Sequence, residues 1–102
     1  MPPKLLTGNA AAAWGARLAG VDYIPAFPIT PQTEIIESLS EWIDNGEMPG
    51  RLVTLESEHS MLTAAGAAAT TGVRVFSATS SQGLLYAMEM LYTVAGWRAP
   101  FV

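Results

Sequence analysis

Short apolar runs alternate along the chain with longer segments in which apolar residues recur at helical spacing. The short runs have the length and the Gly, Pro or polar boundaries of strands, and they cover residues 21–27, 52–55 and 73–78. The longer segments predict helices over residues 10–19, 31–45, 59–71 and 82–95. Strands that alternate with helices are typical of an α/β fold with a mostly parallel sheet.

The predicted helices differ in how much of their surface is apolar. The first, with Thr7 or Asn9 as its cap, has an apolar stripe made by Ala11, Trp14 and Leu18, and the second has one apolar face. The third consists almost entirely of small residues, which predicts tight packing on several sides, and the fourth is apolar on nearly every side, which predicts that it is buried. A chain of 102 residues cannot cover both, so we expect a closely associated partner subunit or further domains.

Composition excludes several functions. With 50% hydrophobic and 14% charged residues, the chain suits one domain over residues 1–102. Its net charge of -4 and its dispersed arginines argue against nucleic acid or a membrane surface as a partner. No apolar run is long enough to span a membrane, and a cytoplasmic location is expected. Without cysteine, the chain alone cannot ligate an iron–sulfur cluster, and its single histidine predicts no metal site.

Polar residues follow each apolar run, in the stretches Pro28–Pro31, Ser57–His59 and Thr79–Gly83. Because the carboxyl ends of parallel strands lie at one edge of a sheet, these stretches are expected to converge on one site. Thr30 could present its hydroxyl group to an anionic ligand at a helix N-terminus. Alternatively, it could serve only as the helix cap before Pro31.

Glu58 is expected in the first turn of a helix, directly after a strand that should be buried on both faces. Its carboxylate could simply favour the positive end of the helix, but a buried carboxyl group can also hold a proton for use in chemistry. Glu56 could share a face with it, although nothing else in the chain supports a glycosidase-like carboxylate pair. His59 could join a proton relay or could be an ordinary polar residue at a helix end.

The segment from Ser77 to Gly83 combines hydroxyl groups, an amide and a glycine at a predicted helix start. These groups could cradle a phosphate or carboxylate, or could only cap the helix through Ser80 or Ser81. The chain contains neither the glycine pattern of a dinucleotide site nor a P-loop. From these residues, a flavodoxin-like phosphate-binding or flavin-binding module is one alternative function, and a non-catalytic assembly subunit is another.

Four motifs, in their order and spacing, are similar to those of one known family. They are Asn9-Ala10-Ala11-Ala12, Phe27-Pro28-Ile29-Thr30-Pro31, Ser57-Glu58-His59 and Ser80-Ser81-Gln82-Gly83-Leu84. Together they resemble the N-terminal pyrimidine-binding domain of the 2-oxoacid:acceptor oxidoreductases, the pyruvate:ferredoxin oxidoreductase family. The resemblance implies a three-layer α/β fold of the thiamine diphosphate-binding type, of which residues 1–102 are the N-terminal part, truncated at the C-terminus.

The resemblance also implies a role for each of the three polar stretches. Glu58 would be the catalytic residue, hydrogen-bonded to N1′ of the cofactor's aminopyrimidine ring and favouring its imino tautomer. Thr30 and Ile29 would contact the substrate. Together with Glu58, the remaining site residues would contact the cofactor: Pro28, Thr79, Ser80, Ser81, Gln82 and Gly83.

By the same resemblance, the chain is one component of an enzyme that oxidatively decarboxylates a 2-oxoacid such as pyruvate to an acyl-CoA, and it is not active alone. Thiamine diphosphate would bind between this domain and another domain or subunit that holds Mg²⁺, so no metal ligand is expected here. Iron–sulfur clusters and coenzyme A would be carried by partner chains or domains in a dimeric assembly. Ferredoxin or a similar protein would accept the electrons.

Overall fold

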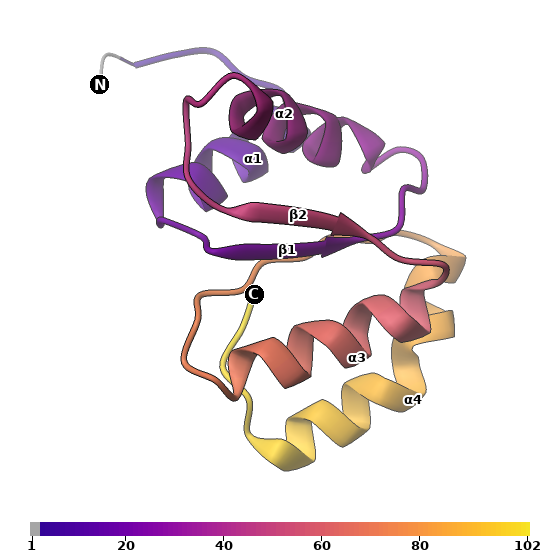
Figure 1. Ribbon diagram of the computed structural model, residues 1–102. Coiled ribbons are helices and arrows are strands. Elements are labelled where there is room, and N and C mark those ends of the chain that lie inside the picture. The colour runs from indigo at the N-terminus through magenta and orange to yellow at the C-terminus, as the bar shows by residue number, and fades with distance from the viewer. Residues whose placement is uncertain (1–2) are drawn as a thin grey trace.

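The computed structural model describes residues 3–102 and has three layers. In chain order, its elements are α1 (Gly8–Leu18), β1 (Tyr23–Ala26), α2 (Thr33–Asp44), β2 (Arg51–Thr54), α3 (Glu58–Ala69) and α4 (Gln82–Trp97). Figure 1 shows α1 and α2 on one face of the sheet and α3 and α4 on the other. The predicted three-layer α/β fold is therefore confirmed.

The sheet is parallel and is built around β1. β1 pairs with β2 in parallel register, with Ile24 opposite Leu52. On the other side of β1, residues 73–78 run alongside it, but only Val75 forms a parallel bridge, with Tyr23. The prediction of a regular third strand over these residues is therefore wrong.

Pro25 explains why the backbone hydrogen bonds between β1 and this segment stop after Phe76. The Tyr23 amide donates to the Arg74 carbonyl, and the Phe76 amide donates to the Tyr23 carbonyl. The next donor from β1 would be Pro25, which has no N–H group. Instead, the Ser77 hydroxyl donates to the Pro25 carbonyl at 2.7 Å. The segment thus occupies the place of a strand, but its backbone hydrogen bonding to β1 does not continue beyond Phe76.

β2 is less buried than its apolar sequence predicts. Arg51 and Thr54 are exposed, and the two residues between them are only half-buried. Among residues 3–102, β2 has β1 as its only strand neighbour, so one of its edges is open. The expectation of burial on both faces is therefore wrong for this chain.

Thr7, one of the two predicted caps, precedes α1, and its hydroxyl oxygen accepts the Ala10 N–H of the first turn at 3.1 Å. The buried residues of α1 are Ala13 and Ala16. Ala11 and Leu18 are exposed, so the predicted stripe through them is wrong. The face that packs inward is the one with the smallest side chains, which allow close approach to the neighbouring elements.

α2 has the apolar face that its sequence predicts. Ile35, Ile36 and Leu39 are buried, and Trp42 is partly buried against the same core. The Trp42 ring lies 4.9 Å from the ring of Trp14 on α1, at an interplanar angle of 56°. These contacts join α1 and α2 into one layer above the sheet.

α3 packs against β1 and α4, and its small residues permit close contact. A Cβ on Gly66 would lie only 2.5 Å from Val94 Cγ2 on α4. α4 is not buried as predicted: Leu85, Tyr86 and Tyr92 are 71%, 70% and 75% exposed. Within residues 3–102, no helix is long and apolar enough to cross a membrane.

Candidate functional site

The three polar stretches meet at the carboxyl edge of the sheet. The Ser80 hydroxyl donates to the Thr30 carbonyl at 3.1 Å, which joins the first and third stretches. The second and third stretches meet where a Cβ on Gly83 would lie 2.9 Å from Glu58 Oε2. The structure therefore brings these residues together, as a parallel sheet predicts.

Glu58 is the first residue of α3, and it is only 5% exposed. Ser57 fixes the start of the helix, because its hydroxyl oxygen accepts the Ser60 N–H at 3.2 Å. The unpaired amides of a first helical turn stabilise a carboxylate placed there. A nearly inaccessible carboxyl group at a sheet edge can act on a ligand rather than interact only with water.

Thr79 and Gly83 surround this carboxyl group. Thr79 Oγ1 is buried, and it has no hydrogen-bond partner among residues 3–102. A Cβ on Gly83 would clash with Thr79 Oγ1 and would also contact the Glu58 side chain. Only glycine therefore fits at position 83 without moving these groups.

The start of α2 differs from the prediction. α2 begins at Thr33 with Gln32 at the cap position, so the assignment of Thr30 as cap and Pro31 as first helical residue is wrong. The Thr33 amide donates to the carbonyl four residues earlier at 3.0 Å, and the Thr30–Pro31 peptide bond is cis. Asn9 Nδ2 donates to the Pro31 carbonyl at 2.7 Å. Thr30 and Pro31, which were expected to begin the helix, therefore lie before it, and their carbonyls accept hydrogen bonds from Ser80 and from Asn9 of α1.

The start of α4 also differs. Ser81 occupies the cap position, but its side chain makes no capping hydrogen bond, and Ser80 bonds to the Thr30 carbonyl instead. Side-chain capping by either serine is therefore wrong. Ser81 has a φ of 52°, a backbone conformation that is costly for a residue other than glycine and that concentrates at ligand sites.

The predicted site residues differ in their exposure. Glu58 and Gly83 are buried, and Ile29, Thr79 and Ser80 are half-buried. The remaining four are exposed: Pro28, Thr30, Ser81 and Gln82. At the carboxyl edge of the sheet, the predicted site thus combines the buried residues Glu58 and Gly83 with more exposed residues from the three loops.

The sequence interpretation missed Gln32. This residue is only 4% exposed, its Nε2 donates to the Phe27 carbonyl at 3.4 Å, and its Oε1 is buried without a partner among the described residues. A polar residue at a helix start is ordinarily exposed, so its position alone gives no sign of burial. The available signal is that it directly follows the Pro28–Pro31 stretch.

Glu56 and His59 lie at the surface. The Ser60 hydroxyl donates to Glu56 Oε1 at 2.5 Å, and this bond, with a backbone hydrogen bond, lowers the pKa of Glu56. Since Glu56 is exposed and Glu58 is buried, the two do not form a carboxylate pair that faces one ligand. His59 Nε2 lies 3.2 Å from Glu89 Oε1, in an exposed pair that links α3 and α4.

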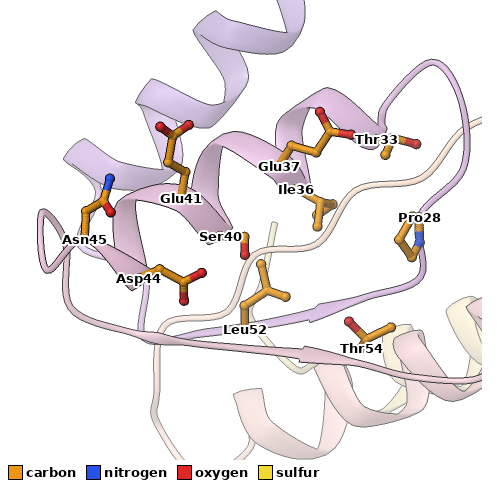
Figure 2. A pocket seen from close by; sticks show the side chains of 10 residues that line it. All are labelled: Pro28, Thr33, Ile36, Glu37, Ser40, Glu41, Asp44, Asn45, Leu52 and Thr54. Atoms are coloured by element: carbon orange, nitrogen blue, oxygen red, sulfur yellow. The ribbon is translucent and has the colours of Figure 1, made fainter.

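A separate groove lies between α2 and β2 (Figure 2). It is open, has a volume of about 540 Å³ and shares only Pro28 with the predicted site. Its carboxylates, from Glu37, Glu41 and Asp44, are exposed to water. We place the candidate site at the Glu58 edge because buried polar groups without partners are found there, and a ligand would satisfy them.

The comparisons with known proteins agree on one family. A profile described as "Pyruvate flavodoxin/ferredoxin oxidoreductase, thiamine diP-bdg" matches residues 14–102. The chain is 50% identical to pyruvate synthase subunit PorA of Methanocaldococcus jannaschii, over 97% of this chain and 25% of that protein. It is also 50% identical, over the same shares, to ketoisovalerate oxidoreductase subunit VorA of Pyrococcus horikoshii. The chain thus spans about a quarter of the length of these curated relatives.

A solved structure supports the same assignment. It is the 2-oxoglutarate:ferredoxin oxidoreductase from Magnetococcus marinus with 2-oxoglutarate, coenzyme A and succinyl-CoA bound. The similarity has a TM-score of 0.70 at 32% sequence identity, and it covers 78% of this chain and 14% of that chain. The chain therefore belongs to the pyruvate flavodoxin/ferredoxin oxidoreductase family and matches its thiamine diphosphate-binding region.

Proposed function

We propose that residues 1–102 form the N-terminal part of the pyrimidine-binding domain of a thiamine diphosphate-dependent enzyme. This enzyme oxidatively decarboxylates a 2-oxoacid to an acyl-CoA and passes the electrons to ferredoxin or a similar acceptor. The observation that carries the proposal is the buried Glu58 carboxyl group at the sheet edge of a member of this family. Since the relatives are named for pyruvate, ketoisovalerate and 2-oxoglutarate, the proposal extends to 2-oxoacids as a class.

The residues at the Glu58 edge fit an aminopyrimidine ring, which presents both nitrogen acceptors and an amino group. The Glu58 carboxyl group can form hydrogen bonds with such a ring, and the Thr79 hydroxyl lies beside that carboxyl group. Gly83 adds no side chain between them. In the part of the chain that the structure describes, no group of three His, Asp or Glu side chains could hold a metal ion. By the family resemblance, the Mg²⁺ ion would be held by another domain or subunit.

When bound, thiamine diphosphate supplies the nucleophilic carbon and the electron sink for decarboxylation. Glu58 would hold a proton at the carboxyl oxygen that faces N1′ of the aminopyrimidine ring and would exchange the proton with that nitrogen. Thr30 and Ile29, in the stretch that Ser80 ties to the edge, would contact the substrate. The other residues would orient the cofactor and exclude water: Pro28, Thr79, Ser80, Ser81, Gln82 and Gly83.

The rest of the enzyme would complete the site. The exposed apolar side chains of α4, including Leu85, Tyr86 and Tyr92, would contact the domain or subunit that holds the diphosphate. Partner chains or domains in a dimeric assembly would carry the iron–sulfur clusters and coenzyme A. A cytoplasmic location remains a prediction from the sequence.

Replacement of Glu58 by Gln in the intact enzyme tests this proposal. Glutamine keeps the size of the side chain and can still donate and accept hydrogen bonds, but its amide cannot exchange a proton with the ring. We expect turnover of 2-oxoacid to fall by about 10²- to 10⁴-fold, the usual contribution of a positioned acid or base. Cofactor affinity should stay within about tenfold, because the side chain still forms one hydrogen bond.

Glu56→Gln is the matched control, since this exposed carboxylate lies only two residues away and can keep its bond from Ser60. It should retain the turnover of the wild-type enzyme. Wild-type turnover in Glu58→Gln would contradict the assignment of Glu58.

A further inference from the structure

Thr79 and Glu58 border the same small space. A Cβ on Gly83 would clash with Thr79 Oγ1 and would lie 2.9 Å from Glu58 Oε2 and 3.1 Å from Glu58 Cγ. Gly83, which has no side chain, leaves the space between the hydroxyl and carboxyl groups open. Both oxygens therefore lie beside the same point, the place that a Gly83 Cβ would take.

The Thr79 hydroxyl is buried without a hydrogen-bond partner among residues 3–102. Buried hydroxyl groups are almost always paired, because an unpaired one has lost its bonds to water. Neighbouring hydroxyls in the same segment are paired: Ser77 bonds to the Pro25 carbonyl at 2.7 Å and Ser80 to the Thr30 carbonyl at 3.1 Å. The unpaired hydroxyl is therefore specific to Thr79 and does not reflect loose packing of the segment.

We propose that Thr79 is a positioning residue for Glu58. In the loaded enzyme, its hydroxyl donates a hydrogen bond to the carboxyl oxygen of Glu58 that does not face the cofactor. This inference rests on the proposed function, in which the other oxygen faces N1′ of the aminopyrimidine ring. One bond from Thr79 fixes the rotation of the carboxyl group and leaves the second oxygen free. Proton exchange requires the oxygen and the ring nitrogen to stay within hydrogen-bond distance.

A purely structural role for Thr79 has different consequences. Thr79 also lines a small cavity of about 90 Å³ beside Phe101, with apolar side chains from α3 and α4. This space is large enough for a water molecule. If a water molecule in this space bonds to the Thr79 hydroxyl, removal of the hydroxyl lowers the stability of the fold and leaves the affinity for the cofactor unchanged.

The test compares Thr79→Val and Thr79→Ser in the intact enzyme. Valine keeps the shape and removes the hydroxyl, so thermal unfolding of the cofactor-free enzyme should occur at the same or a higher temperature. The dissociation constant of thiamine diphosphate, measured by titration, should rise by about three- to tenfold, as expected for one hydrogen bond. Turnover at saturating cofactor should fall by about tenfold. Serine, which keeps the hydroxyl, should restore both values.

Thr93→Val is the control, because the Thr93 hydroxyl bonds to the Glu89 carbonyl of its own exposed helix at 3.2 Å. It should change neither affinity nor turnover. The proposal is overturned if Thr79→Val keeps wild-type affinity and turnover, or if its effect is a lower stability without a change in affinity. If the wild-type enzyme neither binds thiamine diphosphate nor decarboxylates 2-oxoacids, the proposed function fails first, and the role of Thr79 fails with it.

Discussion

At the residue scale, the site is defined by polar groups that the fold leaves buried. Glu58 and Gln32 are the two buried polar residues among those described, and Thr79 adds a buried hydroxyl without a partner. Burial without pairing costs free energy that a stable fold ordinarily avoids. All three lie in or next to the loops at the carboxyl edge of the sheet. The cost of the unpaired Gln32 and Thr79 groups is explained if the loaded enzyme supplies their hydrogen-bond partners.

Gly83→Ala should disrupt this arrangement. The added Cβ would clash with Thr79 Oγ1 and contact Glu58, and such overpacking costs about 1–3 kcal/mol of stability. Because the clash falls on the carboxyl group, we expect affinity for thiamine diphosphate to fall as well. Cofactor titration and thermal unfolding of the intact enzyme measure the two effects.

Gly96→Ala in the same helix is its control, since a Cβ there meets nothing within 4 Å. It should stabilise α4 by about 0.5–1 kcal/mol, the usual gain from Gly to Ala in a helix. Equal effects of the two substitutions on cofactor affinity would contradict a special role for Gly83.

The sequence predicted part of the site because the chemistry lies close to strand ends. Glu58 lies three residues after the apolar run over residues 52–55, at the start of a predicted helix, so the sheet topology places it at the carboxyl edge. Gln32 was missed because its burial depends on the folded loop before α2. Its bond to the Phe27 carbonyl forms only when that loop turns back. The unpaired state of Thr79 likewise depends on contacts between segments far apart in the chain.

At the element scale, local sequence signals predict where the helices lie, but they fail where contacts between distant segments determine the start of a helix or the extent of a strand. Thr7 and Ser57 cap α1 and α3 as their sequences indicate. Thr30 does not cap α2: the Ser80 hydroxyl donates to the Thr30 carbonyl, Asn9 donates to the Pro31 carbonyl, and the helix begins only at Thr33. The predicted third strand does not form beyond a single bridge because Pro25 of β1 lacks an N–H group, and no pattern within residues 73–78 shows this.

The contact between α3 and α4 depends on Gly66. A Cβ on Gly66 would lie 2.5 Å from Val94 Cγ2 and 3.2 Å from Trp97 Cζ3. We therefore expect Gly66→Ala to separate the two helices at a cost of about 1–3 kcal/mol. Hydrogen exchange of the α3 and α4 amides in the intact enzyme should become faster.

Gly15→Ala in α1 provides the comparison, because a Cβ there meets nothing within 4 Å. Exchange in its helix should stay the same or become slower. Unchanged exchange of α3 and α4 in Gly66→Ala would show that this contact does not limit their packing.

At the scale of the whole molecule, the chain spans about a quarter of the length of its curated relatives, and α4 exposes several large apolar side chains. α4 is apolar on nearly every side, yet Tyr86 and Tyr92 are at least 70% exposed. α4 also begins at Gln82 and Gly83, two of the predicted cofactor contacts. A domain or subunit that packs on α4 would therefore also border the cofactor.

The most direct test is the rate at which the C2 hydrogen of thiamine diphosphate exchanges with deuterium in the intact enzyme without substrate. Acid quenching and proton NMR measure this rate in wild-type enzyme and in Glu58→Gln. The account predicts faster exchange in the wild-type enzyme than in free cofactor, and a loss of about 10²-fold or more in Glu58→Gln, because only the carboxyl group can exchange a proton with the ring. An equal exchange rate in both proteins, with the cofactor bound in each, would contradict it.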